Sequence, residues 1–243
     1  MDREKVKFAA VRMKSISGDI SENLKKIETI CTQAHERGID IICFPELAVT
    51  GADADDLGLK LFEISESIPG RVTNQLSQIA QCCHLYIVIG MSQKSRVPGR
   101  LFNTQVIISP EGKIKAVYQK INPEGIEQLY YKGSVSKEIK VLELPFAKVG
   151  LLMGNDEKCS ETVKKMQEEK VRVILMSSAS TKQDICQRQD SVRELAKSCG
   201  AYVIASDNNT SFIVLPNGTV QDEIFAPNEM IEAEIDRQLL YKK

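Results

Sequence analysis

The sequence predicts an α/β protein in which mixed β-sheets are covered by helices. Short apolar runs alternate with amphipathic stretches along the chain, as strands and helices do when they succeed one another. Two pairs of apolar runs flank Pro-x-Gly turns at residues 110–112 and 216–218, and turns of this kind join hairpin strands. Strand–helix alternation interrupted by hairpins favours sheets with both parallel and antiparallel pairs.

The first half of the chain begins with a strand over residues 6–13. Ser21 is predicted to cap a helix over residues 23–37, where apolar residues recur at helical spacing, and Gly38 ends that helix. Residues 39–44 carry little polar content, which is typical of a strand covered on both faces. The same reasoning predicts a helix over residues 72–83 and strands over residues 85–91, 104–109 and 114–120.

The second half continues the alternation. It is predicted to contain strands over residues 148–153, 171–177, 202–206, 212–215 and 219–222, and helices over residues 161–170 and 190–199. No linker, low-complexity tract or short repeat divides the sequence. A chain of 243 residues is long enough for a sizeable core, so residues 1–243 are interpreted as one domain.

Composition excludes several classes of partner. The formal net charge is -1, which gives no electrostatic reason to expect nucleic acid or an anionic membrane, whereas a small neutral or zwitterionic ligand is compatible with it. No apolar stretch is long enough to span a membrane, and no secretory signal is expected. Seven scattered cysteines and only two histidines, His35 and His84, predict a cytoplasmic protein without a metal site.

Three strand ends carry residues that could do chemistry. Glu46 follows an apolar strand beside a proline, Lys120 ends a hairpin strand, and Gly154 follows a buried strand at a tight turn. The ends of strands are where catalytic groups of α/β proteins collect. Taken singly, each residue is more often an ordinary surface or turn residue than a functional one.

Taken together and in this order, the three segments resemble the nitrilase superfamily of carbon–nitrogen hydrolases. The family's Phe-Pro-Glu motif with a following Thr-Gly matches residues 44–51, and its later lysine matches Lys120. A second glutamate before an aromatic pair and a glycine is best matched by Glu127, although that segment is one residue shorter here. Further matches lie at residues 68–70, 102–103, 110–112 and 211–218, so the resemblance covers about residues 6–222.

The resemblance implies a four-layer α-β-β-α sandwich and an amidase that hydrolyses non-peptide C–N bonds of small amides. It implies that Glu46 acts as general base, that Lys120 stabilises the tetrahedral intermediate and that Glu127 belongs to the same site. It also implies homodimers or higher homo-oligomers. No cofactor is implied.

One departure lies at the centre of this resemblance. Where the family has Gly-x-x-x-Cys-x-Asp, residues 150–156 place Gly154 at the position of the nucleophilic cysteine. Glycine has no side chain that could form a covalent acyl-enzyme, and loss of a nucleophile can cost roughly a millionfold in turnover. Cys159 is an alternative nucleophile, but it is expected to face away from Glu46 and Lys120.

Three hypotheses therefore stand. The chain is a ligand-binding pseudoenzyme that has lost the family's hydrolysis, an amidase into which a cysteine-to-glycine change was introduced by experiment, or a structural, partner-binding protein. The first is favoured because other departures, such as Asn122 in place of a frequent histidine, accompany Gly154.

Overall fold

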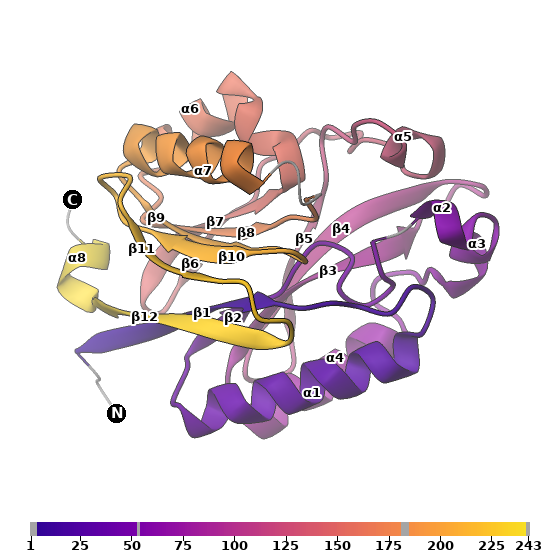
Figure 1. Ribbon diagram of the computed structural model, residues 1–243, viewed down its shortest axis with the longest axis horizontal. Coiled ribbons are helices and arrows are strands. Elements are labelled where there is room, and N and C mark those ends of the chain that lie inside the picture. Colours follow the sequence, from indigo (N-terminus) through magenta and orange to yellow (C-terminus); the bar gives the residue numbers. More distant parts are fainter. Residues whose placement is uncertain (1–3, 53, 181–184, 242–243) are drawn as a thin grey trace.

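The computed structural model describes residues 4–52, 54–180 and 185–241. Over these residues it is a four-layer α-β-β-α sandwich, in which two six-stranded sheets pack face to face and helices cover their outer faces (Figure 1). The predicted fold class is confirmed, including the mixed character of both sheets.

The first sheet has the strand order β12-β1-β2-β3-β4-β5. Strand β2 pairs in parallel with both of its neighbours, and the remaining pairs are antiparallel. Its strands are β1 (Lys5–Arg12), β2 (Ile41–Cys43), β3 (Tyr86–Lys94), β4 (Leu101–Ile108), β5 (Ile114–Gln119) and β12 (Glu229–Asp236).

The second sheet has the strand order β11-β10-β9-β8-β7-β6. Strand β8 pairs in parallel with both β7 and β9, so the two sheets share a parallel centre with antiparallel margins. Its strands are β6 (Val141–Leu144), β7 (Ala147–Met153), β8 (Val173–Ser177), β9 (Tyr202–Ser206), β10 (Ser211–Val214) and β11 (Val220–Ile224).

Apolar side chains form three layers of core. One layer lies between the first sheet and helices α1 (Ile20–Glu36) and α4 (Arg71–Cys83), and another between the second sheet and helices α6 (Ser160–Glu168) and α7 (Ile185–Cys199). The third lies between the sheets, where Phe8 and Phe146 pack edge to face. The shorter helices are α2 (Ala54–Leu57), α3 (Lys60–Ile64), α5 (Glu127–Tyr130), α8 (Arg237–Tyr241) and the 3₁₀ helix η1 (Gly154–Lys158).

Two predicted helix starts are wrong. Helix α1 begins at Ile20, because the Asp19 carboxylate accepts a hydrogen bond from the Glu22 N–H at 3.0 Å and thereby caps the helix in place of Ser21. Helix α7 already includes Ile185, five residues before the predicted start, because its first six residues, Ile-Cys-Gln-Arg-Gln-Asp, show no apolar period that would indicate a helix.

Two strands were not predicted, β6 and β12. Strand β12 alternates exposed glutamates with buried apolar residues such as Ile231 and Ala233, and it pairs antiparallel with β1 at the sheet edge.

No helix in the described part of the chain is long and apolar enough to cross a membrane.

Candidate functional site

Strand ends from both sheets meet at one end of the sandwich. Strand β2 ends at Cys43 and the chain continues to Glu46, while strand β7 ends at Met153 and leads directly to Gly154. The Glu46 N–H donates to the carbonyl of Ser178, after β8, at 3.2 Å. The backbone therefore ties together the ends of the two sheets, where α/β proteins usually place their binding groups.

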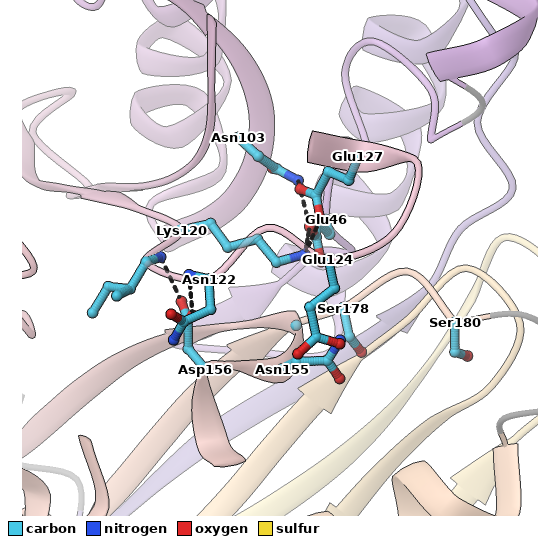
Figure 2. A network of polar contacts seen from close by, with 12 residues as sticks. Glu46, Asn103, Lys120, Asn122, Glu124, Glu127, Asn155, Asp156, Ser178 and Ser180 are labelled. Carbon is cyan, nitrogen blue, oxygen red and sulfur yellow. Dashed lines mark hydrogen bonds and ion pairs between the residues drawn. The ribbon is translucent and has the colours of Figure 1, made fainter. Parts of the chain in front are cut away.

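A buried polar network fills this junction (Figure 2). The Lys120 ammonium lies 2.6 Å from a Glu46 carboxylate oxygen and 2.7 Å from a Glu127 carboxylate oxygen. The Asn103 amide, on β4, donates to Glu127 at 2.6 Å and also to Glu46. Two carboxylates thus share one ammonium and one amide.

The network is largely shielded from solvent. The side chains of Glu46, Lys120 and Glu127 are 3%, 6% and 17% exposed. Charges in such surroundings are stabilised mainly by one another and little by water. Removing one partner therefore leaves the others as uncompensated buried charges. The three residues therefore form one electrostatic unit.

Charge and burial shift the acidity of this unit. Burial raises the pKa of Glu46 to about 7, against the lowering effect of Lys120, while the charge of Glu127 raises it further. The pKa of Lys120 is raised, because attraction from Glu46 and Glu127 outweighs the opposing effect of burial. Lys120 therefore stays protonated as a hydrogen-bond donor, and Glu46 titrates near neutral pH.

This pKa shift predicts how stability depends on pH. A carboxyl group whose pKa is higher in the folded chain binds its proton more tightly there, so its contribution to stability is lost as the pH rises through the folded pKa. For Glu46 the window runs from about 4.5, its ordinary value, to about 7. The loss is at most about 3 kcal/mol over this range. Urea unfolding at a series of pH values should show this decline in the free energy of unfolding, and Glu46→Gln should flatten it. If Glu46→Gln leaves the dependence of the free energy of unfolding on pH unchanged, the pKa of Glu46 is not raised in the folded chain.

Gly154 adjoins the network through its Cα. It adopts a left-handed conformation with φ of 50°. A Cβ atom at this position would lie 2.6 Å from the Lys120 Nζ and 3.1 Å from a Glu46 carboxylate oxygen. A side chain here would therefore point into the ion pair, and the end of Lys120 now fills the space it would need.

Asp156 anchors the segment that follows Lys120. Its buried carboxylate accepts hydrogen bonds from the Tyr118 hydroxyl at 2.8 Å and from the N–H groups of Ile121 and Asn122 at 3.0 and 2.8 Å. Since Asp156 lies two residues after Gly154, it links the turn that ends β7 to the end of strand β5 and to the residues that follow Lys120.

The opposite side of the same turn is held by Arg188 of α7. Its guanidinium donates to the Gly154 carbonyl at 2.7 Å, to Glu157 at 2.7 Å and to the Asn155 side chain at 3.1 Å. Figure 2 shows Asn155 and Asp156 on successive positions of this turn. Contacts from both sides thus fix the turn.

Two cavities lie beside the network. One of about 680 Å³ is lined by residues of the segment that follows Lys120, among them Asn122 and Tyr131, and also by Cys159. The other, of about 220 Å³, is lined by Asn155, Arg188 and their neighbours. A groove of about 670 Å³ lies between α1 and α4. Glu46, Lys120 and Glu127 line none of these three cavities, but the first two are lined by residues that directly follow Lys120 and Gly154 in the chain. We therefore place the candidate site at the strand ends.

The arrangement suits a small polar molecule. A lysine ammonium has three N–H donors, and the two ion pairs use two of them. The third is suited to a carbonyl oxygen, while carboxylate oxygens accept amide N–H groups. Within residues 4–52, 54–180 and 185–241, no three His, Cys, Asp or Glu side chains are placed to share a metal ion.

The structure brings together all four residues that the sequence singled out, Glu46, Lys120, Glu127 and Gly154, while their catalytic roles stay predictions. Sequence reasoning missed Asn103 and Arg188 as site residues. Asn103 had a signal, because it belongs to residues 102–103, which match the family, and a polar side chain within a buried strand needs a partner. Arg188 had none, since it lies before the predicted start of its helix.

Comparison with known families gives a match over nearly the whole chain. A family model described as carbon-nitrogen hydrolase matches residues 7–242. Among curated proteins, an omega-amidase of Xenopus tropicalis is 30% identical over 149 residues, which is 58% of this chain and 52% of that protein. A nitrilase of Pyrococcus abyssi is 31% identical over 153 residues, 62% of this chain and 56% of that protein. The matches span about half the length of these relatives.

Solved structures have the same fold. A mutant amidase of the nitrilase superfamily from Nesterenkonia superposes with a TM-score of 0.86 and 17% identity, covering 96% of this chain and 92% of that chain. A glutamine-dependent NAD+ synthetase from Acinetobacter baumannii gives a TM-score of 0.83 and 24% identity, covering 96% of this chain and 46% of that chain. At these identities the likeness concerns the fold alone.

Proposed function

Because the chain belongs to the carbon–nitrogen hydrolase family of the nitrilase superfamily, we propose that its buried Glu46–Lys120–Glu127 network binds a small amide without hydrolysing it by a covalent route. In this proposal Gly154 stands where the family has its cysteine. The site keeps a base and a cation but has no nucleophile.

One observation carries the proposal. A Cβ atom built on Gly154 would point at the Lys120 ammonium and at a Glu46 carboxylate oxygen, 2.6 and 3.1 Å away. An activated nucleophile must lie within hydrogen-bond reach of its base. A side chain at Gly154 would point toward Glu46, so it would lie within reach of the base. Glycine supplies no atom there to attack a carbonyl carbon.

The remaining groups are complementary to a primary amide. The third N–H of Lys120 would donate to the amide oxygen, and the carboxylate of Glu127 would accept from the amide nitrogen. A mutant of the Nesterenkonia amidase, whose fold this chain shares, was solved in complex with butyramide. That complex supports a small aliphatic amide as the first compound to test.

Binding of butyramide, measured by isothermal titration calorimetry, tests the proposal. We expect saturable binding to the unmodified chain and weakening of roughly tenfold or more in Glu127→Gln, because a hydrogen bond to a charged group is lost. Glu194→Gln, a change at an exposed position of α7, is the matched control and should bind as the unmodified chain does. Absence of binding at millimolar butyramide, or equal affinities in both variants, would contradict an amide site at this network.

A further inference from the structure

The buried network is largely closed to solvent in this structure. The side chains of Glu46 and Lys120 are 3% and 6% exposed, and neither they nor Glu127 line any of the three cavities described above. A small amide therefore cannot reach the Lys120 ammonium unless a segment that covers the network moves.

Two of the segments around the network are firmly held. The turn at Gly154 is fixed from opposite sides by Asp156 and Arg188. The backbone N–H of Lys120 donates to the carbonyl of Asn103 at 2.9 Å, which continues the pairing of β4 with β5. Movement of either segment would break several buried hydrogen bonds.

Residues 123–129, which we call the α5 segment, are held much less firmly. None of them is buried, and Ile126 and Leu129 are 54% and 73% exposed. A Cβ atom at Gly125 would meet no atom within 4 Å, so there is open space beside the segment at that point. Its backbone hydrogen bonds are local, such as that from the Gln128 N–H to the Gly125 carbonyl at 3.2 Å. A segment with so little buried apolar surface opens at a low cost in free energy.

Two carboxylates tie the α5 segment to the rest of the protein (Figure 2). Glu127 lies 2.7 Å from the Lys120 ammonium and accepts from the Asn103 amide at 2.6 Å. Glu124 accepts from the Asn155 amide at 2.7 Å. Because Glu127 belongs both to the segment and to the network, displacement of the segment breaks the pair with Lys120 and uncovers the ammonium.

Both ends of the α5 segment are anchored. Before it, the N–H groups of Ile121 and Asn122 donate to the buried Asp156 carboxylate. After it, Tyr131 is 1% exposed and pairs with Leu101 at the start of β4. The segment can therefore move between two fixed ends while the sheets stay intact, as lids over binding sites do.

From these observations we infer that the α5 segment is a lid, which opens to admit a small amide and closes on it by returning Glu127 to the network. Opening leaves Lys120 paired with Glu46, so neither of these two buried charges is left uncompensated. The identity of the ligand rests on the proposed amide site, whereas the movement of the lid requires no ligand.

Relaxation-dispersion NMR of ¹³C-labelled isoleucine and leucine methyl groups tests this movement in the free protein. We expect conformational exchange at Ile126 and Leu129, seen either as relaxation dispersion or as doubled signals. Ile174 and Leu175, in the buried strand β8, are the internal control and should show neither.

A variant at the edge of the lid tests how it is held. Glu124→Ala removes the tie to Asn155 and leaves the buried network intact. Loss of this hydrogen bond should raise the population of the open lid roughly three- to tenfold. Glu232→Ala, at an exposed position of β12, is the matched control and should leave the exchange unchanged. Flat profiles with single signals at the lid methyl groups, or exchange that Glu124→Ala does not alter, would overturn the inference.

Butyramide separates the lid from the amide site. Saturating butyramide should suppress the exchange at Ile126 and Leu129, because the bound amide favours the closed lid through its contact with Glu127. Exchange that persists in full with butyramide bound, or butyramide binding without any exchange, would refute the lid and leave the amide site. Exchange in a chain that binds no butyramide would support the lid and refute the amide site.

Discussion

Gly154→Cys is expected to create amide hydrolysis and, at the same time, to lower the free energy of unfolding. The new thiol would enter the space between Glu46 and Lys120, because a Cβ atom there points at both groups. The gain in turnover is bounded by the roughly millionfold contribution that a nucleophile can make. The cost is roughly 1–3 kcal/mol, because φ is 50° and the end of Lys120 must withdraw.

Ammonia release from butyramide and urea unfolding measure the two effects. Gly154→Ala is the matched control, since it adds the same Cβ atom and the same backbone strain without a thiol. We expect both variants to lose similar stability and only Gly154→Cys to release ammonia. Equal, background-level release from both would mean that Glu46 and Lys120 are not placed to activate a side chain at residue 154.

Lys120→Met should destabilise the fold by roughly 3–5 kcal/mol, the usual cost of removing one partner from a buried ion pair. Without the ammonium, the carboxylates of Glu46 and Glu127 would share a buried site with only the Asn103 amide between them. The loss should be largest well above pH 7, where Glu46 is ionised, and smaller below it, where Glu46 takes up a proton. Urea unfolding at two pH values checks both the size and the trend.

Lys115→Met is the control for this change, because Lys115 lies on the same strand β5 with an exposed side chain. A surface substitution of this kind usually changes the free energy of unfolding by less than about 0.5 kcal/mol. If Lys120→Met costs no more than Lys115→Met, the buried network does not contribute to stability as its geometry requires.

Much of the fold could be predicted because hydrophobic periodicity reports burial directly. The central strands β2, β7 and β8 are buried along their length and stand out as apolar runs. Strand β12 could not be predicted in this way, because its alternating glutamates make an edge strand look polar. The cap of α1 was misplaced because Asp19 and Ser21 are both good N-caps, and only the hydrogen bond to Glu22 distinguishes them.

The candidate site could be predicted only where a family motif marked a residue. Glu46, Lys120, Glu127 and Gly154 carried such marks, and the structure places them together. The pairing of Arg188 with Glu157 crosses 31 positions in the sequence, and neither residue stands in a recognisable pattern. One-domain organisation, self-association and a cytoplasmic location stay predictions.

NMR of butyramide in the presence of the unmodified chain tests most directly whether the site binds an amide without hydrolysing it. We expect the butyramide signals to broaden or shift as the amide binds Glu127 and Lys120, and no butyrate to form beyond the rate in buffer alone. Butyrate formation that the unmodified chain catalyses and that Glu46→Gln abolishes would contradict it, because the site would then hydrolyse amides without a side chain at Gly154.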